Sequence, residues 1–255
     1  MAWEGGDFLA IFYIDAGHGG AETGATRTYN NVQYSEKDFN LQLALLVKRF
    51  LQTISPQQTI YLYRETDKNG NRYMRGQDAK SKGADIFISI HNNSASNTSA
   101  SGTLTLYPKT FTLGWETSKN FASYMQGTVI SYMNSKGWGV TDNGISIWTN
   151  SDSELGVFQG AAPIPSCLVE CAFMSNNKDI EKLLNQGFLE DMAYSISLGA
   201  VRWLNKYKGL NISEPKRIEE AMIEKSSLLP VLGIALIAIV SYYVFKGGFK
   251  KWWMF

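Results

Sequence analysis

Two histidines are the residues of this chain whose type and position point most directly to chemistry. The 255 residues contain only His18 and His91, in the segments IDAGHGG and ISIHNN. Each follows an apolar run that is typical of a strand, so both imidazoles are expected at strand ends of one sheet, where they can converge. Zinc is commonly held by two histidines and a carboxylate, with a further position left open for water. The pair therefore predicts a zinc site.

A carboxylate is needed to complete such a site, and the sequence offers two. Glu36 begins a predicted helix 18 residues after His18, where the connecting loop can fold back. Glu22, in HGGAETG, is nearer in sequence, but a loop acid so close to the first histidine is as easily exposed. Spacing favours Glu36 and leaves Glu22 open. Asp15 is expected to orient the His18 ring, because metal-bound histidines commonly donate their second N–H to a carboxylate.

Glu170 lies inside the apolar segment CLVECAF, where strand alternation places it on one face with Leu168 and Ala172. A buried carboxylate without a partner is costly, so Glu170 needs a counter-charge, a metal or a catalytic role. Beside a hydrolytic zinc site it would serve as general base and acid, since burial raises a carboxyl pKa toward neutrality. Cys167 and Cys171 are expected on the opposite face as two small apolar side chains, kept reduced.

The elements that must position these residues alternate between strands and helices. Apolar runs predict strands at 8–14, 58–64, 85–91, 102–108 and 167–173. Helical periodicity predicts helices at 36–54, 72–83, 116–135, 177–185 and 188–207. This rhythm is typical of an α/β fold with a largely parallel or mixed sheet, in which catalytic groups lie at the carboxyl ends of strands.

Composition and charge exclude several classes of protein. Hydrophobic residues make up 44% of the chain, which excludes a disordered protein, and two cysteines exclude a small disulfide-stapled domain. A net charge of +1 argues against nucleic-acid binding through a basic surface. The charges are unevenly distributed along the chain. The last thirty residues carry three lysines and no acid, whereas residues 1–225 carry 21 basic and 23 acidic side chains.

The uncharged segment 228–245, LLPVLGIALIAIVSYYVF, predicts one transmembrane helix. A helix of that length covers about 27 Å, close to the hydrocarbon thickness of a bilayer. Lysines and tryptophans at 246–255 form a basic, aromatic tail of the kind found at membrane interfaces. The expected division is a catalytic domain at 1–207, a polar linker or stalk at 208–227, the span at 228–245 and the tail at 246–255.

Four segments resemble, in order and spacing, the motifs of zinc-dependent N-acetylmuramoyl-L-alanine amidases, the cell-wall amidases of bacterial autolysins and phage endolysins. They are IDAGHGG, SEKDFNL, RETD with RGQDAKSKGADIFISIHNN, and LVECAFMSN, and the similarity covers residues 8–207. The resemblance implies a sheet of about six strands sandwiched by helices. It implies His18, Glu36 and His91 as zinc ligands and Glu170 as catalytic acid and base, and it favours Glu36 over Glu22.

The chain departs from the family's pattern in two places. Asn92 stands where alanine is common, and Cys171 and Ala172 fill the two places after the glutamate of an LVETGF-type motif. Both changes leave the charged groups intact and bear on substrate fit. Arg64 and Arg75 also match the family, and we expect them to serve packing or ion pairing.

The resemblance implies a peptidoglycan hydrolase that cleaves the amide between N-acetylmuramic acid and L-alanine of the stem peptide. Its expected partners are peptidoglycan and, through residues 228–245, a lipid membrane, with no nucleic acid. The N-terminal segment lacks the pattern of a secretory signal. The expected setting is therefore a phage lysin anchored in a virion membrane or in the membrane of an infected host. Two alternatives are an inactive amidase fold that tethers a membrane to peptidoglycan, and a zinc peptidase that cuts within the stem peptide.

Overall fold

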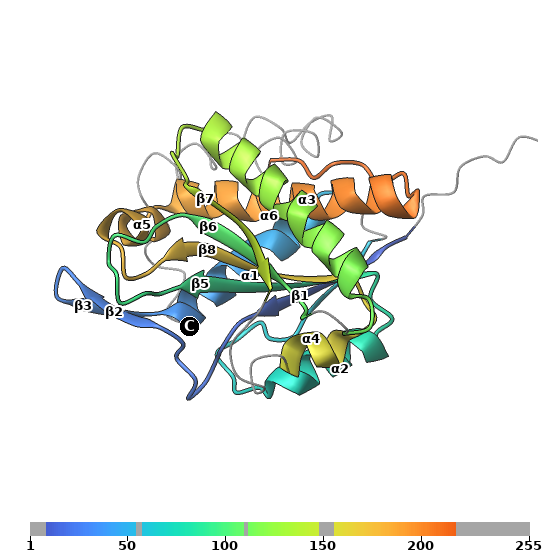
Figure 1. Ribbon diagram of the computed structural model, residues 1–255, viewed down its shortest axis with the longest axis horizontal. Coiled ribbons are helices and arrows are strands. Elements are labelled where there is room, and N and C mark those ends of the chain that lie inside the picture. Colours follow the sequence, from blue (N-terminus) through green and yellow to red (C-terminus); the bar gives the residue numbers. More distant parts are fainter. Residues whose placement is uncertain (1–8, 55–57, 110–111, 148–155, 218–255) are drawn as a thin grey trace, which may run out of the picture. The chain divides into compact units, whose positions relative to one another are not determined.

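The computed structural model describes residues 9–54, 58–109, 112–147 and 156–217 (Figure 1). The chain divides into two compact units, residues 1–215 and 216–255, and the first unit carries the α/β fold. At its centre is a six-stranded sheet of order β4-β1-β5-β8-β6-β7. Its strands are β1 (Ile11–Ala16), β4 (Thr59–Leu62), β5 (Ile86–Asn93), β6 (Thr103–Tyr107), β7 (Asp142–Ile147) and β8 (Ser166–Phe173).

The sheet is mixed, as the sequence predicts. Strands β4, β1, β5 and β8 run parallel to one another. Strand β6 pairs antiparallel with β8, and β7 pairs parallel with β6. Parallel strands end at the same edge of a sheet, so their last residues lie together. At this edge His91 of β5 is in register with Glu170 of β8, and His18 follows the end of β1.

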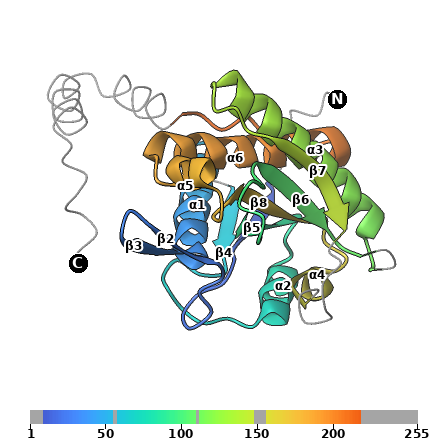
Figure 2. The ribbon, with the colours of Figure 1, turned by 60° about the vertical axis from the view of Figure 1, so that its left-hand side comes forward.

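Helices cover both faces of the sheet and form a three-layer sandwich (Figures 1 and 2). One face carries α1 (Glu36–Leu51), α3 (Trp115–Ser135) and α6 (Gln186–Lys208), and the other carries α2 (Arg72–Ser81) and α4 (Gly156–Ala161). The short α5 (Asn177–Leu183) connects β8 to α6, and a separate hairpin of β2 (Thr26–Tyr29) and β3 (Val32–Ser35) leads into α1. The α/β prediction is confirmed.

Two glycines allow α2 and α4 to pack closely beneath the sheet. A Cβ atom at Gly76 would lie 2.2 Å from the carbonyl oxygen of Val157, and one at Gly160 would lie 2.1 Å from that of Tyr73. The backbones can therefore touch only because both side chains are absent. The pair covers a core of buried residues from sheet and helices, among them Tyr13, Ala79, Phe87, Phe158, Ala161 and Leu168.

The structure adds four elements that the sequence patterns did not reveal: strands β2, β3 and β7 and helix α4. The β2–β3 hairpin turns at Asn30 and Asn31, whose φ angles of 49° and 62° are those of a tight hairpin turn. Strand β7 lies at the sheet edge and is largely polar, DNGISI, so it lacks an apolar run. Helix α4 has only six residues, GVFQGA, too few to show helical periodicity.

The structure describes only part of the predicted linker, membrane span and tail. None of the helices in the described residues is long and apolar enough to cross a membrane. The predicted span at 228–245 and the tail at 246–255 lie outside the described residues, as does the second half of the expected linker, residues 218–227. The linker's first residues pack against α6, because Asn205 exchanges two hydrogen bonds with the backbone of Ile212 and Arg202 pairs with Glu214 at 2.6 Å.

Candidate active site

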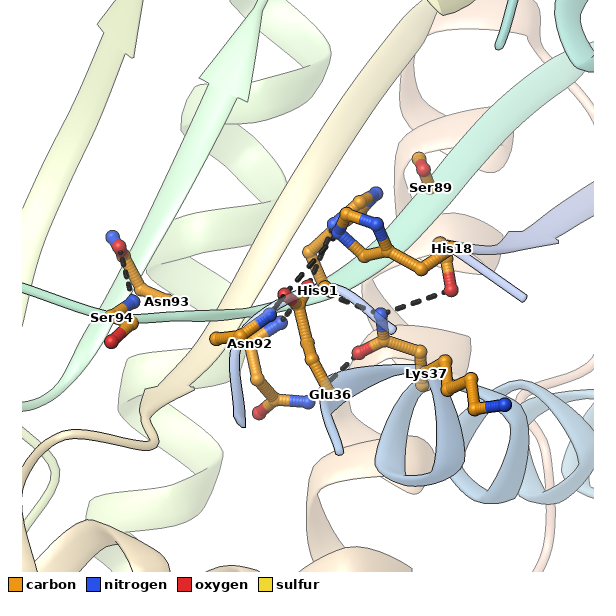
Figure 3. A network of polar contacts seen from close by, with 12 residues as sticks. His18, Glu36, Lys37, Ser89, His91, Asn92, Asn93 and Ser94 are labelled. Atoms are coloured by element: carbon orange, nitrogen blue, oxygen red, sulfur yellow. Dashed lines mark hydrogen bonds and ion pairs between the residues drawn. The ribbon is translucent and has the colours of Figure 1, made fainter. Parts of the chain in front are cut away.

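Three side chains from separate elements converge at the carboxyl edge of the parallel strands (Figure 3). Glu36 begins α1, and its carboxylate contacts both imidazoles. Its Oε2 atom is 3.2 Å from Nε2 of His18, and its Oε1 atom is 2.9 Å from Nδ1 of His91. One donor atom from each residue can be chosen so that all three lie within 4.8 Å of one another. The structure thus brings together the two histidines and the acid that spacing favoured.

Glycines shape the backbone around the two rings. A Cβ atom at Gly17 would lie 2.2 Å from Nε2 of His91, and one at Gly24 would lie 2.4 Å from Oε2 of Glu36. Only glycine can occupy these positions without displacing a side chain of the cluster. His18 itself has a φ of 59°, which is uncommon outside glycine and typical of residues held at functional sites.

Glu36 is held as a carboxylate. Burial alone would raise its pKa, but its contacts with His18 and His91 keep the pKa well below the ordinary value. Two backbone N–H groups also donate to it, from Ala25 at 2.9 Å and from Asn92 at 3.2 Å. The negative charge is therefore stabilised by groups from three parts of the chain.

An amide pair lies behind Glu36. Nδ2 of Asn40 donates to Oε1 of Glu36 and to the carbonyl oxygen of Gly17, each at 3.2 Å. Nδ2 of Asn92 in turn donates to Oδ1 of Asn40 at 2.9 Å. Both amides are buried. They link the first turn of α1 to β5 and to the turn before His18, which fixes the acid relative to the histidines.

The prediction that Asp15 orients the His18 ring is wrong, because the Asp15 carboxylate binds Arg75 and Ser89. Its Oδ1 atom accepts a hydrogen bond from Nη1 of Arg75 at 2.8 Å, and its Oδ2 atom accepts one from Ser89 at 2.8 Å. Nη2 of Arg75 donates to the backbone oxygen of His18 at 2.7 Å. Because Arg75 lies between them, Asp15 acts on the backbone of the His18 turn and not on its imidazole.

Arg64 reinforces the same turn. Its guanidinium donates to the carbonyl oxygens of Ala16 and Gly17, each at 2.9 Å, and to that of Lys37 at 2.7 Å. Burial, followed by repulsion from Arg75, lowers the pKa of Arg64. Both arginines therefore hold backbone carbonyl oxygens of this turn, and Arg75 also forms an ion pair with Asp15.

Glu170 faces the same cavity from β8. It is 7% exposed, and its Oε2 atom is buried without a hydrogen-bond partner in the part of the chain that the structure describes. Burial raises its pKa well above the ordinary value, and the nearby charge of Glu36 raises it further. A carboxyl group in this condition takes up a proton readily and is suited to proton transfer near neutral pH.

The cavity that joins these groups has a volume of about 250 Å³. His18, Glu36, His91 and Glu170 line it, and Arg72 and Glu22 contribute to its wall. Glu22 is exposed and its backbone pairs with Gly19 across the turn, so it lies apart from the His–Glu–His cluster. Of the two acids that spacing left open, Glu36 is the one that lies beside both histidines.

The donor set fits a zinc ion. Zinc bonds of about 2.0–2.1 Å in a tetrahedral arrangement place neighbouring donor atoms roughly 3.3–3.4 Å apart. The His–Glu distances of 3.2 and 2.9 Å are close to that separation. Two imidazoles and a carboxylate leave a further position free, and Glu170, whose Oε2 atom has no hydrogen-bond partner among the described residues, lines the same cavity.

Sequence reasoning missed the side chains that support the cluster. Asn40, Ser89 and the amide of Asn92 carry no chemistry of their own, so their residue types do not mark them as functional. The signal that would have found Gly17 is the glycine-rich turn itself, because a tight approach of backbone to a functional side chain is a common reason for glycine.

Comparison with known proteins places this site in a family. The profile of the family described as N-acetylmuramoyl-L-alanine amidase (Amidase_3) matches residues 12–202. The N-acetylmuramoyl-L-alanine amidase CwlM of Bacillus licheniformis is 29% identical over 200 residues, 78% of this chain and 71% of that protein. The endolysin of Bacillus phage SPP1 is 27% identical over 224 residues, 87% of this chain and 76% of that protein.

A solved structure agrees with these matches. The N-acetylmuramoyl-L-alanine amidase from Clostridium difficile 630 superposes with a TM-score of 0.67 at 28% identity, over 78% of this chain and 98% of that chain. The family match covers the six-stranded sheet almost completely, together with the cavity at its edge. The chain belongs to the N-acetylmuramoyl-L-alanine amidase family and is an enzyme that hydrolyses peptidoglycan.

Proposed function

We propose that this amidase is a zinc hydrolase in which His18, Glu36 and His91 hold the metal and Glu170 moves the proton. The observation that carries the proposal is the meeting of a His–Glu–His donor set with an unpaired, buried carboxyl group in one cavity of the described residues. When bound, zinc would polarise the scissile carbonyl group and lower the pKa of water in the site.

Glu170 supplies the acid and base chemistry. Its raised pKa lets it accept the proton of the attacking water and then donate that proton to the nitrogen of the leaving L-alanine. The bond formed joins the water oxygen to the lactyl carbonyl carbon of N-acetylmuramic acid, and the bond broken is the amide. Because β8 fixes its register against His91, Glu170 needs no movement of the backbone to reach the site.

The supporting contacts preorganise this arrangement. Arg64 and Arg75 hold the carbonyl oxygens of the His18 turn, and Asn40 with Asn92 holds the acid. These groups fix the donor atoms before substrate binds, which reduces the cost of ordering the site during reaction.

The experiment compares three variants of one cavity by zinc content and by peptide release from purified sacculi. Glu170→Gln is expected to keep its zinc and lose release, whereas His91→Ala is expected to lose both. Glu22→Gln is the matched control, since Glu22 lines the cavity outside the donor set, and it should keep both. Full release by Glu170→Gln, or retained zinc in His91→Ala, would refute the assignment.

We further propose that the enzyme is a phage lysin anchored to a membrane by residues 228–245. The hydropathy of that segment and the similarity to an endolysin of a Bacillus phage support this setting. Carbonate extraction of membranes tests the anchor: the full chain should stay in the pellet, and release into the supernatant would contradict it. Mass spectrometry of purified virions tests the virion location, which absence of the protein would exclude.

A further inference from the structure

A second cavity lies beside the catalytic one and is lined by basic and polar side chains. Its volume is about 590 Å³. Arg27 of β2 contributes to one wall, and Lys178 and Lys182 of α5 contribute to another. In Figure 1 the β2–β3 hairpin, α5 and the loop after β5 gather at the edge where β5 and β8 end. The cavity thus opens at the same edge of the sheet as the active site.

The charge in this cavity is positive. Among the described residues that line it, the one acid is Asp179, which is buried and already accepts hydrogen bonds from the backbone N–H groups of Gly102 and Phe173 at 2.8 and 3.0 Å. Lys182 lies 3.3 Å from its other carboxylate oxygen. Arg27 donates to a neutral partner, Oδ1 of Asn177 at 2.6 Å, so this contact does not neutralise its charge.

Arg27 also has unused donor capacity. Its Nε atom is buried and has no hydrogen-bond partner among the described residues. Leaving a buried charged donor without an acceptor is unfavourable, and the negative charge of an anion in the cavity would partly offset this cost. Carboxylates match the planar fork of a guanidinium group particularly well.

The walls of the cavity are held in place by bonds between its segments. Nδ2 of Asn176 donates to the carbonyl oxygen of Thr98 at 2.8 Å, which joins the start of α5 to the loop after β5. The hydroxyl of Tyr29 donates to Glu181, which joins the hairpin to α5. These bonds fix the walls of the cavity relative to one another.

The same two chain segments line both cavities. In the first segment, Ala25 lines the catalytic cavity and Arg27 lines the basic one. In the second, Ser94 lines the catalytic cavity and Thr98 lines the basic one. Two residues of extended chain span about 7 Å. A peptide that runs from the active site along these two segments would bring its second or third residue to Arg27.

We propose that this basic cavity binds a free carboxylate of the stem peptide, one or two residues beyond the L-alanine whose amide is cleaved. The inference rests on the proposed function for the direction of the peptide. It makes Arg27, with Lys178, a determinant of substrate specificity: stem peptides with a free carboxylate at that point would bind better than those in which it is amidated.

The test uses binding and needs no turnover. The probes are two short peptides that begin with acetyl-L-alanine and differ only in carrying a carboxylate or a carboxamide at the following residue. Calorimetry on the full chain with Glu170→Gln should show about tenfold tighter binding of the carboxylate peptide, the effect of one charged hydrogen bond. Equal binding of the two peptides would overturn the proposal.

Variants locate the effect. Adding Arg27→Gln should reduce the preference to less than about twofold. Because Arg27 also contacts α5, Lys178→Gln provides a second variant, and it should weaken the same preference. The control is Lys206→Gln on α6, whose Nζ atom lies over the rings of Tyr124 and Tyr207 away from this edge, and it should leave the preference intact.

Two failures can be told apart. An unchanged preference in both cavity variants would refute the carboxylate site, whatever reaction the enzyme catalyses. Failure of the parent chain to release peptides that begin with L-alanine from sacculi would refute the proposed function, and a carboxylate preference that depends on Arg27 would then still support the site.

Discussion

The ion pair between Asp15 and Arg75 offers the sharpest test of how the site is supported. The two side chains are 2% and 3% exposed, and their charged atoms are 2.8 Å apart. Asp15→Asn keeps the shape of the side chain but removes the charge, which leaves the guanidinium of Arg75 buried and uncompensated. Arg64, also buried, then adds an unfavourable neighbouring charge.

The expected cost follows from this burial. Breaking a buried ion pair by removing one partner destabilises a protein by about 3–5 kcal/mol. For a domain of this size the loss corresponds to a Tm lower by roughly 6–20 °C. The matched control is Glu214→Gln, which breaks a pair with Arg202 whose side chains are 49% and 44% exposed. An exposed pair contributes only about 0–1 kcal/mol.

Urea denaturation and calorimetry measure both variants. Because Arg75 holds the backbone oxygen of His18, Asp15→Asn should also weaken zinc binding by about 10–100-fold in a chelator competition, whereas Glu214→Gln should not. A loss of stability in Asp15→Asn no larger than that of the control would refute the reasoning. So would a large loss of stability with unchanged zinc affinity, since the pair would then support the fold and not the site.

Further predictions concern the glycine turn and the buried acid. Gly17→Ala places a Cβ atom 2.2 Å from the His91 ring, so zinc affinity should fall by about 10–100-fold; Gly127→Ala, with nothing within 4 Å, is the control and should bind zinc normally in the same chelator competition. In metal-free protein the pKa of Glu170 is raised by folding, so its contribution to stability is fully present below the unfolded pKa and is lost as pH rises through the folded pKa. In the presence of chelator, the free energy of unfolding of Glu170→Gln should therefore exceed that of the parent at pH 8 and about equal it at pH 4. Denaturation curves at the two pH values measure this difference. A difference that does not change with pH would contradict the burial of a titrating acid.

The positions of the candidate site residues could be predicted because a parallel sheet imposes them. His18 follows β1 and His91 lies near the end of β5, and these strands run in the same direction, so their convergence required only the correct assignment of β1 and β5. Glu170 stands out in sequence because a carboxylate is rare within an apolar strand. These inferences depend on local pattern and strand direction, both of which the sequence carries.

The supporting contacts could not be predicted in this way. The pairing of Asp15 with Arg75 joins residues far apart in sequence, and the amide pair of Asn40 and Asn92 depends on how α1 lies against β5. Short or polar elements such as β7 also escaped, because edge strands bury little apolar surface. Tertiary packing decides these features, and no local pattern reports it.

The most direct test of the central claim is the identity of the new amino terminus released from purified sacculi. If His18, Glu36 and His91 hold zinc and Glu170 transfers the proton at the lactyl amide, mass analysis should find peptides that begin with L-alanine and glycan strands with free lactyl carboxylates. Chelator should stop their release and zinc should restore it. New termini at any other residue, or release that continues unchanged in chelator, would contradict the account.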